Sequence, residues 1–324
     1  MNDQRVDRTG SISLSCVVPC WNDAEALDRL MPGLVDVLAA SVAEWEIVVV
    51  DDGSTDAIDE SLRHWLHLPG FRALQLSRNF GKEAALAAGL RAARGDVVVM
   101  LDADLQHSPT LIPAMFQYWR QGADMVYALR VHRRDESFVK RWGAKLFYKI
   151  INFSGRVEIP AGAGDFRLMD RAVVDALLAL PERIRFMKGL YAWVGFQTVA
   201  MPYEPAQRIC GHTHFDALRL LRMSFDGITA FTNWPLRAVS FLGFLLALFG
   251  FFYGGYLCVD FFMNGHDVSG WTTIVVSLML FMGVQLVSIG VLGEYISRIF
   301  EEVKGRPLYV VRRELGQGLK VPAK

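Results

Sequence analysis

Two long apolar segments near the C-terminal end constrain the fold of this chain more than any other feature. A helix needs about 20 apolar residues to cross the hydrocarbon core of a bilayer. Ala238–Val259 and Trp271–Gly293 both reach that length without a charged side chain. The alternative is a pair of buried core helices, but helices of soluble proteins rarely lack a polar face over such lengths. The sequence therefore predicts two transmembrane helices within residues 236–296.

The charges around these segments predict their orientation. The short link Met263–Gly270 contains no lysine or arginine, whereas both outer flanks are basic. The flanking basic residues are Arg219, Arg222, Arg237, Arg298, Lys304, Arg306, Arg312 and Arg313. Cytoplasmic loops are enriched in lysine and arginine, so we expect the link to lie outside the cell. The α/β part described below and a C-terminal tail, residues 297–324, are then cytoplasmic.

Residues 216–235, before the first apolar segment, have the pattern of an amphipathic helix. Between Asp216 and Phe231, apolar side chains share one helical face and charged side chains another. The apolar face holds Leu218, Leu221, Phe225 and Ile228, and the charged face Arg219, Arg222 and Asp226. This pattern fits a helix in the membrane interface. It fits equally a helix packed on a soluble domain.

Composition narrows the possible functions. The 324-residue chain has 34 acidic and 34 basic residues, so its net charge gives no indication of nucleic-acid binding. The four cysteines form no CxxC pair and no metal-ligand spacing, which favours a reducing compartment. The segment Met1–Ser15 lacks the apolar region of a secretory signal, and residues 1–12 are expected to be a flexible N-terminus.

The N-terminal part alternates between β-rich runs and helical stretches. Short, β-branched apolar runs are typical of strands in a buried parallel sheet, and they occur at Leu14–Val18, Glu46–Val50, Ala73–Leu76 and Val97–Leu101. Helical character lies between them, at Ala24–Ala40, Ala57–Leu66 and Lys82–Ala93. This alternation predicts a doubly wound, Rossmann-like α/β domain with a mainly parallel sheet over residues 13–215. Ligands of such sheets bind at the carboxyl ends of the strands.

An acidic motif follows the fourth predicted strand. Asp102 and Asp104 are separated by one residue, and Gln106 supplies an amide shortly after them. Hard divalent cations such as Mg²⁺ are held by one or two carboxylates together with substrate phosphates. Such a cation neutralises charge on a leaving diphosphate. A solvated acidic turn is the alternative, but the buried strand before the motif and a second acidic cluster argue against it.

That second cluster, Asp51–Asp56, follows the second predicted strand. Gly53 permits a tight turn, and the polar residues after it can cap the next helix. A turn and a cap do not explain the two adjacent acids at the strand end. A carboxylate at this buried edge can accept hydrogen bonds from a ribose or base.

The loops after the other two strands carry weaker signals. Trp21, in Val17–Asp23, either stacks on a base or ribose or is a packing aromatic. Ser77–Lys82 combines a glycine with two cations before a helix, which suits a phosphate-facing loop. Further on, Arg130–Arg141 carries five basic and two acidic side chains after the β-like run Met125–Ala128. This stretch is either an anion-binding segment or a solvated loop that also responds to anionic lipid.

The motifs VVPCWND, VDDGSTD, LSRNFGKEAAL and MLDADLQHSP, in this order, resemble the family 2 glycosyltransferases with the GT-A fold. Segments 164–171, 186–190, 225–228 and 292–307 are similar to the polyprenyl-phosphate branch of that family. This branch includes bactoprenol glucosyltransferases and is similar to the dolichol-phosphate mannose synthases. The resemblance covers roughly residues 13–313 and, taken as a set of motifs, is specific.

The resemblance implies roles for particular residues. The nucleotide side would be formed by Pro19, Asp52, Lys82, Asp102 and Arg208, and the metal ligands would be Asp104, Gln106 and Asp102. Asp102, Asp104 and Asp165 would be the catalytic residues, with Asp165 near the sugar and acceptor. Arg130, Arg133 and Arg141 would hold the acceptor phosphate. The family's R-x-x-G-x-[ST]-K-[FY] segment departs from the pattern here, because His214 replaces its lysine.

These roles imply an inverting transfer from a nucleotide-sugar, with a UDP-sugar such as UDP-glucose favoured, to polyprenyl (undecaprenyl) phosphate. The cofactor would be Mg²⁺ or Mn²⁺, and the location the cytoplasmic face of the bacterial inner membrane, in a multi-pass homo-oligomer without nucleic-acid partners. Two alternatives within the same fold are a transferase with a hydroxyl acceptor in polysaccharide or glycolipid synthesis and a non-catalytic membrane scaffold. A subunit of a lipid-sugar flippase is a third, which two membrane spans make less favourable.

Overall fold

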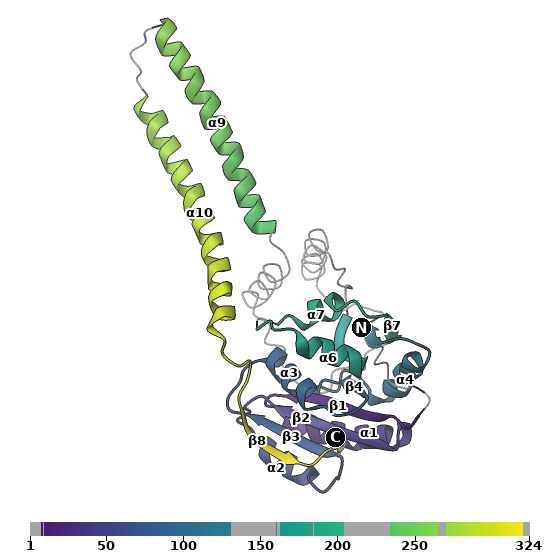
Figure 1. Ribbon diagram of the computed structural model, residues 1–324. Coiled ribbons are helices and arrows are strands. Elements are labelled where there is room, and N and C mark those ends of the chain that lie inside the picture. Colours follow the sequence, from purple (N-terminus) through teal and green to yellow (C-terminus); the bar gives the residue numbers. More distant parts are fainter. Residues whose placement is uncertain are drawn as a thin grey trace.

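The computed structural model describes residues 8, 10–130, 160, 163–183, 185–203, 234–264 and 270–319. An α/β domain forms one end of the molecule, and two long helices extend from it side by side (Figure 1). The domain is built on one eight-stranded sheet in the order β7-β5-β6-β4-β1-β2-β3-β8. The strands are β1 (Ser13–Cys20), β2 (Glu44–Asp51), β3 (Phe71–Leu76), β4 (Val97–Met100), β5 (Met125–Arg130), β6 (Ala163–Asp170), β7 (Thr198–Tyr203) and β8 (Val311–Gly316).

Strand direction changes along the sheet. The central strands β1, β2, β3 and β4 are parallel to one another. Strand β6 is antiparallel to both β4 and β5, β7 is parallel to β5, and β8 is antiparallel to β3. The result is the mainly parallel GT-A sheet that the sequence predicted.

Helices cover both faces of this sheet. They are α1 (Ala24–Ser41), α2 (Ile58–Trp65), α3 (Lys82–Ala92), the 3₁₀ turn η1 (Pro109–Leu111), α4 (Ile112–Arg120), α6 (Arg171–Ala179) and α7 (Met187–Trp193). One core contains the apolar side chains of α1, α2 and α4, and the other those of α3, α6 and α7. Helix α1 buries Leu27, Leu30, Leu34 and Leu38, which recur at helical spacing on one face. The predicted strands and helices between Leu14 and Leu101 are confirmed to within about two residues at each end.

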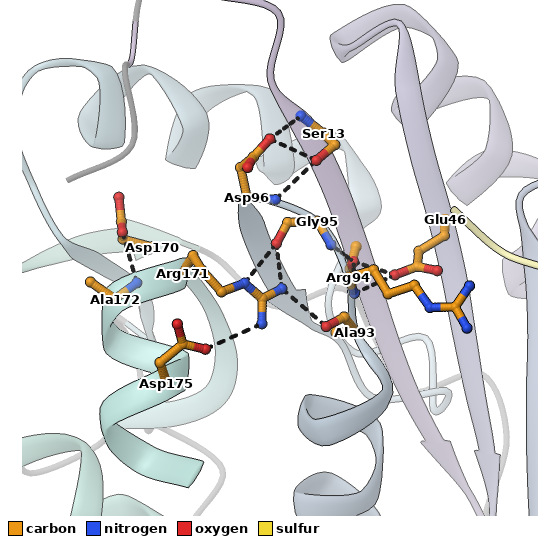
Figure 2. A network of polar contacts seen from close by, with 11 residues as sticks. Ser13, Glu46, Ala93, Arg94, Gly95, Asp96, Asp170, Arg171, Ala172 and Asp175 are labelled. Atoms are coloured by element: carbon orange, nitrogen blue, oxygen red, sulfur yellow. Dashed lines mark hydrogen bonds and ion pairs between the residues drawn. The ribbon is translucent and has the colours of Figure 1, made fainter. Parts of the chain in front are cut away.

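A polar network closes the sheet at the edge opposite the carboxyl ends of the parallel strands (Figure 2). Arg171, the first residue of α6, donates from Nε to the carbonyl of Gly95 at 3.0 Å. The carboxylate of Asp96 accepts from the backbone N–H of Ser13 at 2.9 Å, and buried Glu46 accepts from the N–H of Arg94 at 2.7 Å. These bonds fix the loop between α3 and β4 against β1, β2 and α6.

Strand β8 was not among the predicted strands. Residues 297–324 were predicted only as a C-terminal tail, whereas Val311–Gly316 pair with β3 at the edge of the sheet. Five of these six residues are exposed, so the strand lacks the apolar alternation by which strands are recognised. The last described part of the chain is therefore part of the α/β domain.

Helices α9 (Trp234–Asn264) and α10 (Trp271–Lys304) form the long extension. Each contains a stretch long and apolar enough to cross a membrane by length and composition, Ala238–Leu257 and Ile274–Lys304. Their apolar side chains are largely exposed, as expected of helices that would face lipid. The predicted interfacial helix, residues 216–235, lies outside the described residues except for its last two positions.

Candidate active site

Three charged side chains meet at the carboxyl edge of the sheet. Asp102 follows β4, Asp165 lies in β6, and Lys82 is the first residue of α3. The Lys82 Nζ lies 2.8 Å from Asp102 Oδ1 and 2.8 Å from Asp165 Oδ2. Because β6 runs antiparallel to β4, with Met100 opposite Arg167, the chain that continues past Met100 meets Asp165. Sheet pairing thus joins two acids that are far apart in the sequence.

Burial and the shared ammonium set the charge states of this cluster. Burial raises the pKa of Asp102, although Lys82 opposes the shift. Burial also acts to raise the pKa of Asp165, but Lys82 and Lys188 outweigh it and the pKa of Asp165 is lowered. The pKa of Lys82 is raised, because the two carboxylates outweigh its own loss of hydration. Asp165 and Lys82 are therefore charged at neutral pH.

The turn after Asp102 places the remaining predicted metal ligands. Asp104 and Gln106 are half-buried in this turn, and the Gln106 N–H donates to Asp104 Oδ1 at 3.1 Å. Leu105 between them has a φ of 59°, a conformation uncommon for residues other than glycine. Within the described residues, no three His, Cys, Asp or Glu side chains form a complete metal cage. The oxygen ligands present fit a hard cation that shares its coordination with phosphate.

Asp52 holds the loop that leads to Lys82. Its buried carboxylate accepts from the backbone N–H of Phe80 at 2.7 Å and of Gly81 at 2.8 Å. Burial raises the pKa of Asp52, and these two hydrogen bonds oppose the shift. Gly81 has a φ of 97°, which favours glycine at this turn. The geometry thus gives Asp52 a loop-positioning contact, and its predicted contact with a base or ribose stays a prediction.

The residues after Asp52 do not cap the helix that the sequence assigned to them. Helix α2 begins after Ala57 without a side-chain cap, so the prediction of a cap from this segment was wrong. Instead, Asp56 Oδ2 accepts from the N–H of Ala24 at 3.0 Å, at the start of α1. The Thr55 N–H donates to Asn22 Oδ1 at 2.8 Å. The loop therefore ties the ends of β1 and β2 together.

The first strand ends beside this loop. Pro19 is buried in β1, opposite Val50 of β2. Trp21 follows the strand and is 50% exposed, so it is not a core packing residue. Its ring is accessible for stacking.

Two residues near the cluster were missed by the sequence analysis. His107 lies between the rings of Phe166 and Tyr203, with centroids 5.2 Å away in both cases. Its Nδ1 is buried and has no hydrogen-bond partner among the described residues. Glu83 follows Lys82, and burial raises its pKa to about 7. The position of His107 directly after the acidic motif is a sequence signal that could have identified it. The raised pKa of Glu83 depends on burial, which the spacing of residues in the sequence does not indicate.

Of the residues predicted to hold the acceptor phosphate, Arg130 is the one among the described residues. The backbone of Arg130 ends β5, where it is paired with Tyr203 of β7. Arg133, Arg141, Arg208 and His214 lie outside the described residues. The roles assigned to these residues stay predictions.

Comparison with known proteins now places this site in a family. The description "Glycosyl transferase family 2" matches residues 15–178, which contain β1 to β6 and the Lys82–Asp102–Asp165 cluster. This chain belongs to glycosyl transferase family 2. A second description, "GtrB C-terminal hairpin", matches residues 234–299, which cover α9 and most of α10. The chain is thus a glycosyltransferase with the GT-A fold and a C-terminal helical hairpin.

Individual relatives extend over nearly the whole glycosyltransferase chain. It is 41% identical to the SfII prophage-derived bactoprenol glucosyl transferase of Shigella flexneri, over 93% of this chain and 98% of that protein. It is 40% identical to the prophage bactoprenol glucosyl transferase homolog of Escherichia coli K12, over 93% and 99%. A crystal structure of glucosyl-3-phosphoglycerate synthase from Mycobacterium tuberculosis with Mn²⁺, UDP-glucose and phosphoglyceric acid aligns with a TM-score of 0.44 at 20% identity, over 67% of this chain and 78% of that one.

Proposed function

We propose that this glycosyltransferase moves a sugar from a nucleotide-sugar to polyprenyl (undecaprenyl) phosphate, at the cytoplasmic face of the bacterial inner membrane. The observation that carries the proposal is the Lys82–Asp102–Asp165 cluster, in a chain whose α/β domain continues into a long apolar hairpin. The names of relatives that align over almost the whole chain support it, since they are bactoprenol glucosyl transferases. A UDP-sugar, with glucose as the sugar, is the favoured donor.

On the donor side, Asp102, Asp104 and Gln106 would hold Mg²⁺ or Mn²⁺. A bound cation supplies charge neutralisation to the leaving nucleoside diphosphate. Lys82 adds a fixed positive charge beside it, since its ammonium already lies within 2.8 Å of Asp102. Asp52 positions the loop before Lys82, so this cation is preorganised before the donor arrives.

On the acceptor side, a phosphate is an anionic nucleophile at neutral pH and needs no strong general base. Orientation is then the main contribution of the protein. Arg130, with Arg133 and Arg141, would hold the acceptor phosphate, and Asp165 would face the sugar from β6. One in-line displacement at the anomeric carbon inverts its configuration.

Membranes that contain the protein test this function directly. Radiolabelled nucleotide-sugars are incubated one at a time with the membranes and polyprenyl phosphate, and the lipid phase is extracted with organic solvent. We expect label in the lipid phase with a UDP-sugar, and far less label with Asp104→Asn. Label that enters only water-soluble polymer would instead indicate a hydroxyl acceptor, and absence of transfer from every donor would contradict the proposal.

A further inference from the structure

A cavity of about 300 Å³ opens at the carboxyl edge of the sheet, where β2 and β3 end and β8 begins. The loop after β2, the start of α2, the end of β3 and the C-terminal strand form its walls. Ligand pockets in proteins usually measure about 300–1,000 Å³. The size of this cavity therefore suits a ligand no larger than a mononucleotide.

The C-terminal strand turns two arginines toward this cavity. Arg313 is opposite Gln75 and Val311 is opposite Leu76, so Arg312 is an extra residue in β8. An extra residue of this kind makes a β-bulge, which re-aims the neighbouring side chains. Arg312 and Arg313 both line the cavity, and both are exposed. Within the described chain, neither guanidinium has a hydrogen bond or an ion pair.

The acidic residues of the cavity, in contrast, already have partners. Asp51 accepts from the Ser54 N–H at 2.9 Å and from Gln75 Nε2 at 3.2 Å. Asp59 accepts from Gln75, and Asp56 from the start of α1. A carboxylate can accept further hydrogen bonds with its remaining lone pairs. The walls therefore offer free cations for a phosphate and acceptors for hydroxyl groups.

The cavity lies on a different face of the sheet from the Lys82–Asp102–Asp165 cluster. Successive side chains of a strand point to opposite faces. Asp51 and Gln75 continue the rows that pack against α1 and α2, through Val49 and Ala73. The row that ends near Asp52 packs instead against α3, which begins with Lys82. A ligand in the cavity is therefore separated from the Lys82–Asp102–Asp165 cluster by the strand ends and the loop after β2.

We propose that this cavity is a second ligand site, which binds a phosphate ester of a sugar, either free or as part of a nucleotide. Its phosphate would lie on Arg312 and Arg313, where planar guanidinium groups bind phosphate in bidentate fashion. Its hydroxyl groups would donate to the carboxylates on the opposite wall. Because β8 follows α10 in the chain, a bound ligand would contact both the segment after the hairpin and the loops of the α/β domain.

Binding, measured without catalysis, tests the proposal. Full-length protein in detergent micelles is titrated with ribose 5-phosphate and with UMP, and binding is measured by calorimetry. EDTA is present so that no metal binds at Asp102 and Asp104. We expect wild type to bind, and Arg312→Gln or Arg313→Gln to bind at least about tenfold more weakly, as for loss of a charged hydrogen bond. Arg63→Gln, which removes an exposed arginine of α2 outside the cavity, should bind both probes like wild type.

The two probes also identify the source of the ligand. Binding of both indicates that a sugar phosphate is sufficient, whereas binding of UMP alone indicates a nucleotide. The proposal is overturned if neither probe binds at millimolar concentration, if Arg312→Gln and Arg313→Gln both bind like wild type, or if Arg63→Gln weakens binding as much as the cavity variants do. Should a glutamine variant fail to fold, Arg312→Lys gives the same comparison, because lysine keeps the charge without the bidentate geometry.

Discussion

At the scale of single residues, the Lys82–Asp102–Asp165 cluster depends on one lysine shared by two acids. Lys82 compensates Asp102 and Asp165, which are both mostly buried at the strand ends. An unpaired carboxylate there would be costly, because burial penalises its charge. The Asp52 contacts to Phe80 and Gly81 keep the loop before Lys82 in place. A hydrogen-bonded loop thus determines where the Lys82 ammonium lies.

Removal of metal should abolish sugar transfer. We expect EDTA to stop the reaction and Mg²⁺ or Mn²⁺ to restore it, because without a metal Lys82 is one cation beside the carboxylates of Asp102, Asp104 and Asp165. Asp104→Asn should lower kcat roughly 100-fold or more, since metal stabilisation of a transition state amounts to several kcal/mol. Asp175→Asn, an exposed acid of α6, is the matched control and should retain wild-type activity. Full activity in EDTA would contradict the metal assignment.

Arg130 should affect the acceptor and not the donor. If this residue at the end of β5 binds the acceptor phosphate, Arg130→Ala should raise the apparent KM for polyprenyl phosphate or lower kcat while donor binding stays near normal. Arg130→Lys should be impaired as well, because lysine lacks the bidentate geometry. Wild-type kinetics in Arg130→Lys would instead indicate that the residue is only attracted to the charge of the membrane. Steady-state kinetics with each substrate varied in turn distinguishes these outcomes.

Glu83 should make stability depend on pH near neutrality. Burial raises its pKa from the ordinary 4.5 to about 7, so the folded chain binds more protons than the unfolded chain between these values. The stability contributed by this group is complete below pH 4.5 and is lost as pH rises through 7, up to about 3 kcal/mol. Glu83→Gln should remove that dependence, as followed by thermal unfolding at pH 5 and pH 8. An unchanged pH dependence in the variant would refute the shift.

At the scale of secondary-structure elements, charged groups of the central sheet hold the C-terminal half of strand β8 and the residues after it. Arg72 of β3 pairs with Glu314 in β8. Buried Glu46 of β2 accepts from the Leu319 N–H at 2.9 Å, and from Ser15 at 2.6 Å. A strand of mainly exposed residues thus gains its place from hydrogen bonds and ion pairs more than from an apolar face.

Glu46→Gln should loosen the C-terminal strand. One carboxylate oxygen faces the Leu319 N–H and the other the Arg94 N–H, so the amide of glutamine would place a donor against one of these donors. We expect a loss of about 1–3 kcal/mol in the free energy of unfolding and faster hydrogen exchange in residues 311–319. Glu44 is an exposed residue of β2, the strand that also contains Glu46, and Glu44→Gln should change neither quantity. Equal exchange rates in the two variants would show that Glu46 does not hold the tail.

At the scale of the whole molecule, a backbone hydrogen bond joins the α/β domain to the end of the hairpin. The N–H of Arg183, after α6, donates to Glu302 near the end of α10 at 2.9 Å. The chain then returns to the sheet through β8, so the hairpin is attached to the domain by both of its flanks. This arrangement requires that both flanks lie on the same side of a membrane.

The membrane orientation can be tested by cysteine labelling in a variant that lacks the four native cysteines. We expect a cysteine at Ser269, in the link between the apolar helices, to react with an impermeant thiol reagent in intact cells. A cysteine at Glu60, exposed on α2, should react only after permeabilisation. The reason is the excess of basic residues on the hairpin flanks. Reversed labelling would place the α/β domain outside the cell and exclude a cytoplasmic donor.

Local sequence determined much of this protein. The period and polarity of neighbouring residues set the buried β-branched strands, the acidic residues that follow them and the uncharged segments within α9 and α10. Only the tertiary structure decided which distant residues meet. Asp165 reaches Lys82 because β6 is antiparallel to β4, Asp56 contacts α1 instead of α2, and the exposed residues of β8 join the sheet edge. Pairings between segments far apart in the chain depend on strand direction and register, which local patterns do not encode.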